Sequence, residues 1–425
     1  RDSVITALQT LAFGADTAEE TLRVLAGHQG DRLDEWRDEQ PGKILHEYRR
    51  GELARIGQIP HTPYYGTVDA TPLFLILIGR HAAWTGRTDV FESLRGNVER
   101  ALEWIDRWGD TDGDGFVDYR SRSERGLVNQ GWKDSGNAIV DADGRLAEPP
   151  IAMVEVQGYV YRARLEIADL FERTGDAARA AALRRQAAEL RDRFNRDFWL
   201  DDKGVYALAL QAGGRPAAVV SSNPGHALWA GIAEPQKARR TRERLTADDM
   251  FSGWGIRTLA ESERAYSPIS YHRGTVWPHD NSIIAAGFKA YGFDTGVVQV
   301  ADGILDAIEA FDDFVLPEAF AGFSRRDYAV PIRYPVACHP QAWAAGSVPH
   351  LLETMPGLEP DGFAGRLRIV RPTLPHMTDC IEVSRMKVGR GRADLAFERT
   401  PEGVGVRVLR TEGDLQVEVD GAPTV

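Results

Sequence analysis

The chain has 425 residues, of which 43% are hydrophobic and 27% charged, and its formal net charge is −12. No apolar run approaches the roughly 20 residues of a membrane span. Acidic and basic residues alternate without a basic face that could neutralise phosphates, so neither a membrane nor a nucleic acid is expected as the main partner. The two cysteines, Cys338 and Cys380, match no metal motif and are predicted to be free thiols of a cytoplasmic protein.

The chain begins at Arg1 without a methionine and already within a predicted helix. We therefore expect it to be the later part of a longer protein. Any targeting signal would lie upstream.

Apolar residues at helical spacing dominate the first 354 residues. The predicted helices have similar lengths and come in pairs, joined by short turns or by long polar loops, chiefly 30–67 and 109–149. This pattern is typical of a toroid of helical hairpins, with the long loops and the site at one end. The expected helices are 3–13, 17–29, 67–86, 90–108, 150–174, 177–199, 221–233, 237–247, 277–291, 295–311 and 339–354.

After Pro356 the hydrophobic pattern changes to strict alternation, which predicts strands. The alternating segments lie at 366–371, 395–399, 403–409 and 414–419. We expect a helical domain over 1–356 and a small β-rich segment over 361–425.

A polar loop at 126–138 has neither helical nor strand periodicity. Trp132 offers an apolar face with a polar edge, Lys133 and Asp134 add opposite charges, and Gln130 adds an amide. Glycines at 131 and 136 allow close approach of the backbone to a ligand. The segment favours a sugar site; a surface loop with Trp132 packed inward is the alternative.

Three acidic residues and one amide outside this loop are further candidates for the site. Asp69 precedes a helix and either caps it or contacts a ligand. Glu155 and Gln157 lie in an otherwise apolar helix, which favours a polar cavity because buried acids need partners. Glu318 follows a proline among apolar residues, a setting that raises a carboxyl pKa.

The segment 266–281 concentrates histidines and aromatic residues. His272 and His279 lack a third ligand at suitable spacing, which argues against a metal. Together with Trp277 and Asp280 they are better explained as a wall that stacks on and hydrogen-bonds to a hydroxyl-rich ligand.

An acidic turn at 110–118 resembles the start of a calcium loop. Asp110, Asp112, Asp114 and Asp118 supply oxygen ligands, but the twelfth position is Ser121 where a bidentate Glu belongs. A structural Ca²⁺ or an ion-free tight turn both fit.

Glycoside hydrolysis needs two carboxyl groups, one protonated and one ionised. Asp134 and Glu318 are the first candidates, with Asp69, Glu155 and Asp280 as competitors. The chain has no G-x-S-x-G, G-x-G-x-x-G or P-loop motif, so we expect no serine nucleophile and no cofactor.

Several ordered motifs over roughly residues 1–350 resemble the bacterial amylo-α-1,6-glucosidase (glycogen debranching enzyme-like) proteins, which are similar to mannosylglycerate hydrolases and glycoside hydrolase family 63. They are Asn-Gln-Gly-Trp-Lys-Asp-Ser at 129–135, Glu-Val-Gln-Gly-Tyr at 155–159, Ser-Asn-Pro-Gly-His at 222–226, Phe-Ser-Gly-Trp-Gly-Ile-Arg-Thr at 251–258, Gly-Thr-Val-Trp-Pro-His-Asp-Asn at 274–281, Leu-Pro-Glu at 316–318, and Tyr-Pro-Val-Ala-Cys at 334–338 followed by Pro-Gln-Ala-Trp-Ala at 340–344.

This resemblance implies an (α/α)6 barrel and an inverting mechanism, with Asp134 as general acid and Glu318 as general base. Asp2 matches an Asp that holds sugar hydroxyls, and an N-terminal β-sandwich domain is expected to precede the chain. The substrate-binding residues expected with them are Tyr65, Asp69, Gln130, Trp132, Lys133, Glu155, Gln157, His226, Trp254, His272, Trp277, His279, Asp280 and Trp343.

We therefore predict an exo-acting glycosidase that removes terminal, α-linked glucosyl residues from oligosaccharides or glycoconjugates. A hydrolase of mannosyl or other glycosyl conjugates and a non-catalytic sugar-binding scaffold are the alternatives. Because Asp134 must stay protonated, Lys133 is predicted to point away from it or to another acid. Trp132, Trp254, Trp277 and Trp343 are predicted to form the walls of the sugar pocket.

Overall fold

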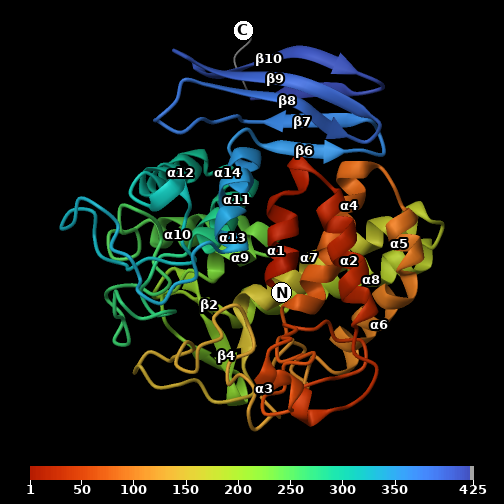
Figure 1. Cartoon of the computed structure of the whole chain (residues 1–425), viewed down its shortest axis with the longest axis vertical. Helices are drawn as coiled ribbons and strands as arrows, with labels where there is room; N and C mark the ends of the chain where they lie inside the picture. The colour runs from red at the N-terminus through yellow and green to blue at the C-terminus, as the bar shows by residue number, and fades with distance from the viewer. Residues whose placement is uncertain (422–425) are drawn as a thin grey trace.

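A computed structural model describes residues 1–421, as a helical domain with β-sheets stacked against one end (Figure 1). Residues 422–425, the last of the predicted β-rich segment, lie outside the described residues. The helices are α1 (Asp2–Gln9), α2 (Asp16–Gly27), α3 (Glu52–Arg55), α4 (Ala70–Thr85), α5 (Asp89–Ser93), α6 (Arg95–Arg107), α7 (Val154–Arg173), α8 (Ala177–Asp197), α9 (Pro224–Ala230), α10 (Pro235–Leu245), α11 (Pro278–Ala290), α12 (Asp294–Ile308), α13 (Ala342–Ala345) and α14 (Ser347–Thr354).

Alternate helices contact one another in a cycle. Helix α1 contacts α4, which contacts α7, then α9 and α11, and α11 contacts α13 and α14, which return to α1. The other long helices pack outside this series: α2 against α1 and α4, α6 against α4, α8 against α7, α10 against α9, and α12 against α11. The domain is thus built from helical pairs with an inner and an outer member.

The sequences of inner and outer helices differ as their positions require. Helix α4 is apolar nearly all round, and thirteen of its residues are buried. The outer helix α8 has one buried stripe and charged residues elsewhere, and the Asp176 side chain caps it by accepting the N–H of Arg179. Helices α9, α10 and α11 each begin with a proline, whose missing N–H needs no partner there.

The helix boundaries mostly match the expected ones. Helix α7 begins at Val154 rather than at 150, because Pro149 and Pro150 precede it and residues 152–153 pair with a strand instead. The segment 90–108 divides into α5 and α6 at Leu94, and 339–354 divides into α13 and α14 at Gly346.

The β-rich segment forms two sheets and begins at Leu358, three residues before the predicted start. Strands β6 (Leu358–Asp361), β7 (Arg366–Val370) and β11 (Gln416–Asp420) form one sheet, in which β7 pairs antiparallel with β6 and parallel with β11. Strands β8 (Cys380–Val388), β9 (Gly391–Thr400) and β10 (Gly403–Glu412) form an antiparallel sheet. Strands β6 and β8 were not among the predicted alternating segments.

Five short strands also lie among the helices, where few were expected. They are β1 (Ala152–Met153), β2 (Trp199–Leu200), β3 (Val205–Tyr206), β4 (Ala209–Gln211) and β5 (Arg215–Ala217). Strand β4 pairs with β1 and β5, which fixes the start of α7.

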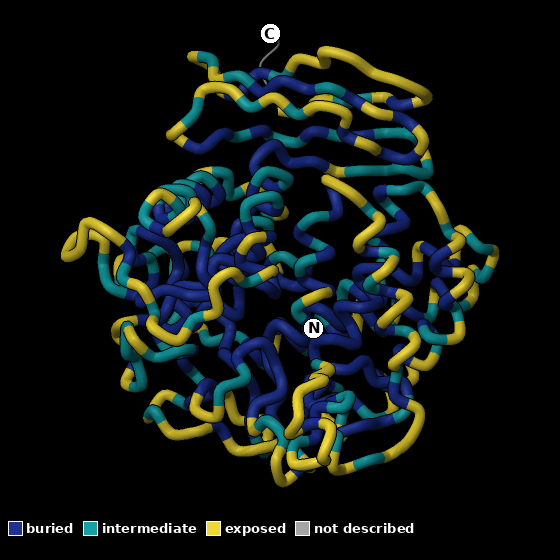
Figure 2. Tube along the Cα trace, in the orientation of Figure 1, coloured by how far each residue is buried: buried dark blue, intermediate teal, exposed yellow. Residues whose placement is uncertain are grey.

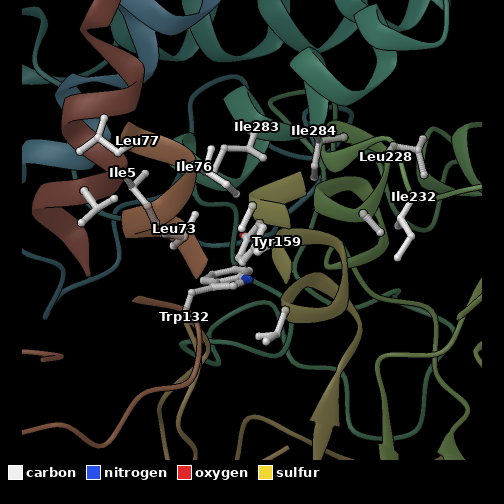
Figure 3. Packing of buried hydrophobic residues seen from close by; sticks show 14 of the residues in the cluster. Ile5, Leu73, Ile76, Leu77, Trp132, Tyr159, Leu228, Ile232, Ile283 and Ile284 are labelled. Atoms are coloured by element: carbon white, nitrogen blue, oxygen red, sulfur yellow. The ribbon is translucent and has the colours of Figure 1, made fainter. Parts of the chain in front are cut away.

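The core lies between the inner helices, where the chain is buried, while the exposed residues lie on outer helices and loops (Figure 2). Ile5 of α1, Ile76 of α4 and Ile283 of α11 contribute to it, and Trp132 enters from its loop (Figure 3). The long loops lie at the end of the domain away from the β-sheets (Figure 1). Within residues 1–421, no helix has the length and apolarity to cross a membrane.

The close contact of α9 and α11 allows a test of this packing. A Cβ atom on Gly287 would lie 2.6 Å from the Gly225 carbonyl oxygen and 2.7 Å from the Trp229 nitrogen. Since backbone cannot move aside cheaply, Gly287→Ala is expected to lower the free energy of unfolding by about 1–3 kcal/mol in urea titrations.

Gly96→Ala is the matched control, because only the end of the Arg100 side chain lies within reach, at 3.4 Å. It is expected to raise the stability by about 0.5–1 kcal/mol through helix propensity. Equal stability of the two variants would contradict the close packing of α9 on α11.

Candidate active site

A cavity of about 460 Å³ takes half of its lining residues from the long loops 30–67 and 109–149. Both predicted catalytic carboxyl groups, Asp134 and Glu318, line it. Trp132, Trp277 and Trp343 form its aromatic wall. Its volume falls within the range of small-molecule sites, about 300–1,000 Å³.

The first turns of the inner helices supply much of the cavity and of the layer beneath it. Asp2 and Trp343 line the cavity from α1 and α13, and Trp277 immediately precedes α11. Glu155 and His226 lie buried in the first turns of α7 and α9. Helix starts present free N–H groups and a partial positive charge, which favours acidic and hydroxylated groups nearby.

Asp134 lies in a mainly desolvated position, with 24% of its side chain exposed. Burial raises its pKa to about 6, although the Arg1 guanidinium, 3.3 Å from its Oδ2, acts in the opposite direction. His46 lies 3.9 Å from the same oxygen, and burial holds the pKa of His46 well below its usual value. A carboxyl group in this setting keeps its proton to higher pH than an exposed aspartate.

Glu318 is held by N–H donors on both of its carboxylate oxygens. The Cys338 backbone N–H donates to Oε2 at 3.3 Å, and the Gln341 amide donates to Oε1 at 3.4 Å. The Glu318 N–H in turn donates to the Cys338 carbonyl at 2.9 Å. Tyr271 lies beside this carboxylate, and burial together with Glu318 raises the pKa of Tyr271.

The aromatic wall is backed by histidines. The His279 ring stacks on Trp343 with centroids 3.8 Å apart, and His272 stacks on Trp277 at 4.9 Å. Trp132 meets Trp277 edge to face at 5.7 Å. Burial holds the pKa of both histidines well below its usual value, so the rings are neutral.

Lys133 points away from Asp134, as predicted. Its Nζ donates to the Thr258 carbonyl at 2.6 Å and lies 5.0 Å from the Trp132 ring centroid. Burial lowers the pKa of Lys133 to about 8, against the attraction of Asp280 and Glu155. The lysine therefore compensates buried acids behind the cavity.

His226 and Asp280 belong to the same buried layer. His226 Nε2 lies 2.8 Å from Asp280 Oδ1, and its Nδ1 lies 2.5 Å from the Tyr159 hydroxyl. His226 also stacks parallel to Trp132 at 5.8 Å. The group of Lys133, Glu155, His226 and Asp280 thus supports Trp132 from behind.

Asp69 and His272 are buried and lie outside the cavity lining. Asp69 is buried at the start of α4 without capping it, and it accepts a hydrogen bond from the Thr67 hydroxyl. Burial raises the pKa of Asp69, while Arg1 opposes the shift. His272 Nδ1 lies 2.8 Å from the Ser135 hydroxyl, next to Asp134.

Of the fifteen residues predicted to bind substrate, Asp2, Trp132, Trp277 and Trp343 line the cavity, and the other eleven do not. Four of those eleven make the following contacts with other parts of the chain. The Tyr65 hydroxyl donates to the His28 carbonyl at 2.7 Å, and the Gln130 amide donates to Asp38 at 3.2 Å. Gln157 brackets Val117, accepting its N–H at 2.9 Å and donating to its carbonyl at 2.7 Å. Trp254 is buried beneath Arg325, whose guanidinium lies 4.2 Å from the ring.

The cavity also contains residues that were not selected from the sequence. These are Arg1, Ser3, His46, Glu47, Tyr48, Arg49, Leu127 and Tyr271. Half of them come from the loop 30–67, whose length and polar composition were the available signal. Tyr271 adjoins His272 in the dense segment, and Arg1 adjoins Asp2.

The acidic turn brings together three of its four predicted ligands. Carboxylate oxygens of Asp110, Asp112 and Asp118 lie within 4.8 Å of one another, and Asp114 is outside this group. Asp110 accepts the N–H groups of Gly113 and Gly115 at 2.7 and 2.9 Å. The oxygen donor set suits Ca²⁺, and binding there stays a prediction.

Both cysteines are free, as predicted. A buried acid with a raised pKa and a second carboxylate line one aromatic-lined cavity, and glycoside hydrolysis requires two such carboxyl groups. Residues 2–323 match the family of mannosylglycerate hydrolase MGH1-like glycoside hydrolase domains. The chain belongs to this family. No curated protein sequence matches the chain.

Solved structures with the same fold are distant in sequence. A family 78 rhamnosidase of Bacillus sp. GL1 has a TM-score of 0.67 at 15% identity, with 100% of this chain and 39% of that chain covered. A family 63 mannosylglycerate hydrolase of Thermus thermophilus, in complex with glucose, has a TM-score of 0.60 at 16% identity, covering 83% and 92%. A sialidase has a TM-score of 0.60 at 13% identity, covering 79% of this chain and 31% of its own. The chain thus spans less than half of the rhamnosidase and sialidase chains.

The raised pKa of Asp134 makes the stability of the protein depend on pH. Because its pKa rises from 3.8 to about 6 on folding, its favourable contribution is present below pH 3.8 and is lost as the pH rises through about 6. Asp134→Asn is therefore expected to be more stable than the wild type at pH 8 by about 1–3 kcal/mol.

Denaturant titrations of both proteins at pH 4 and pH 8 measure this difference, which should be smallest at pH 4. Asp169→Asn is the control, since its side chain is 65% exposed. A difference between wild type and Asp134→Asn that did not grow with pH would contradict the desolvated position of Asp134.

A calcium site in the acidic turn would stabilise the fold by about 2.7 kcal/mol when Ca²⁺ is at one hundred times its Kd. The expected result is a higher melting temperature in Ca²⁺ than in EGTA. Asp112→Asn should abolish the increase, whereas Asp143→Asn, in a separate exposed turn, should retain it. Equal melting temperatures with and without Ca²⁺ would leave the turn as an ion-free one.

Proposed function

We propose that this protein is an inverting, exo-acting glycoside hydrolase in which Asp134 is the general acid and Glu318 the general base. The observation that carries the proposal is the placement of both carboxyl groups in one aromatic-lined cavity, with the pKa of Asp134 raised to about 6. The cycle of contacts among inner helices supports an (α/α)6 toroid as the framework.

The chemistry follows from the two environments. Protonated Asp134 gives its proton to the glycosidic oxygen while the bond from that oxygen to C1 breaks. Glu318 accepts a proton from a water molecule that attacks C1 from the opposite face, which inverts the anomeric configuration. Such a water fits between carboxyl groups about 6.5–9.5 Å apart.

The substrate we propose is a small mannosyl or other glycosyl conjugate rather than a glucan branch. The family match supports this, and so does the fold shared with a mannosylglycerate hydrolase, whose named substrate has a carboxylate on its aglycone. Arg49 lines the cavity with 57% of its side chain exposed, and its guanidinium pairs with Glu47 at 2.7 Å, so an anionic aglycone would compete with that carboxylate for the arginine. The aromatic wall of the cavity suits the apolar faces of a sugar ring.

Asp134→Asn and Glu318→Gln are each expected to lower kcat by about 10³-fold or more on the best substrate, because each removes a proton-transfer group. Asp169→Asn and Glu172→Gln, both on the exposed side of α7, should retain wild-type kcat. Near wild-type turnover in either of the first two variants would refute the assignment.

NMR of the first product formed identifies the sugar and its anomer together. A panel of mannosyl and glucosyl conjugates, with charged and neutral aglycones, is expected to yield the anomer opposite to that of the substrate. Release of glucose from α-glucosides alone would favour the narrower glucosidase prediction, and sugar binding without hydrolysis of any conjugate would favour the non-catalytic scaffold.

A further inference from the structure

A second cavity of about 430 Å³ lies at the opposite end of the inner helices, beside the C-terminal sheet. Lys289 and Glu353 line it from the last turns of α11 and α14, Arg80 lines it from the second half of α4, and Glu359 and Val370 belong to the sheet. It shares no lining residue with the Asp134 cavity. Five of its residues also line a smaller adjoining cavity of about 50 Å³.

Most of the cations in this cavity already have partners. Arg162 donates to the Trp229 carbonyl at 2.7 Å and to Glu166 at 3.2 Å. Lys289 and Arg371 both pair with Asp294, at 3.0 and 3.2 Å. These cations also neutralise the carbonyl ends of helices, so they leave little positive charge for an anionic ligand.

Arg80 and Glu353 differ from these cations, because the side chains of both lack hydrogen-bond partners in the described part of the chain. The closest ion pair of Arg80 within residues 1–421 is with Glu353 Oε1 at 3.8 Å, too long for a hydrogen bond. Oε2 of Glu353 is buried and has no partner among these residues. Burial raises the pKa of Glu353 to about 7, against Arg80 and Arg162.

The cavity therefore offers a donor and an acceptor side by side, next to an aromatic ring. The Trp229 indole lines both the larger and the smaller cavity, and Ile5, Leu73 and Ile283 give the smaller one an apolar floor. His350, one turn before Glu353 on α14, is buried and lies 3.1 Å from the Ser282 hydroxyl.

An anion would meet Glu353, Glu359 and helix C-termini, and a cation would meet Arg80 and Arg162. Neighbouring hydroxyl groups of one neutral molecule can accept from Arg80 and donate to Glu353, while the carbon face of its ring lies on the indole. We propose that this cavity is a second binding site for a neutral sugar, held by Arg80 and Glu353. Binding there requires neither Asp134 nor Glu318.

The test is ¹⁹F NMR of protein labelled with fluorotryptophan, titrated with D-glucose, D-mannose and, separately, inorganic phosphate. Trp229→Phe assigns the resonance of the second cavity, and Trp277→Phe and Trp343→Phe assign those of the first. The Trp229 resonance is expected to shift saturably with at least one of the two sugars and not with phosphate.

Glu353→Gln and Arg80→Met are expected to weaken that titration about tenfold or more, as when a hydrogen bond to a charged group is lost. The titrations of Trp277 and Trp343 should not change. Arg184→Met, on the exposed surface of α8, is the control. Because Glu353→Gln conserves shape, it remains informative if Arg80→Met fails to fold.

A Trp229 resonance that responds to neither sugar would overturn the proposal. So would an equal response in Glu353→Gln and wild type, or saturation by phosphate instead of sugar. Since the measurement is binding alone, it is independent of whether Asp134 and Glu318 catalyse hydrolysis.

Discussion

The structure depends on the electrostatic balance among charged groups buried where the inner helices begin. Lys133, Asp280 and Glu155 are almost wholly inaccessible, and an isolated charge in such a position would be strongly unfavourable. Asp280 and Glu155 both favour the charged form of Lys133. His226 forms a hydrogen bond with Asp280. His226 of this layer stacks on Trp132, which lies two residues before Asp134. The buried layer therefore restricts the movement of the loop that carries Asp134.

The two carboxyl groups of the cavity are distinguished by their surroundings rather than by their chemical type. Asp134 lies in a desolvated position that raises its pKa to about 6, whereas the Glu318 carboxylate is oriented by two N–H donors. Environments that differ in this way allow two carboxyl groups to take opposite roles at one pH. They come from loops nearly two hundred residues apart, and only the closure of the helical pairs brings them together.

The sequence predicted the structure correctly where one physical requirement determines which residues occur, such as the burial of one helix face. The long periodic segments correctly predicted the helices, and the need to keep Asp134 protonated correctly predicted that Lys133 points elsewhere. Polar residues within the motifs were harder to interpret, since an amide that braces backbone looks the same as one that binds a ligand. Gln157 holds Val117, forty residues earlier in the chain, and that partner is visible only in three dimensions. Strand β8 was missed because its largely exposed side chains obscure the alternation.

The cavity also shows how a family could keep one reaction while its sequences diverge. Glu318 is oriented by the main-chain N–H of residue 338, and the thiol at that position is exposed. The orientation of Glu318 therefore depends on the path of the backbone, not on which side chain residue 338 carries. Selection at this position would act on loop shape and on the N–H group, so cysteine could be replaced there during evolution by any residue that preserves the turn, except proline, which has no N–H.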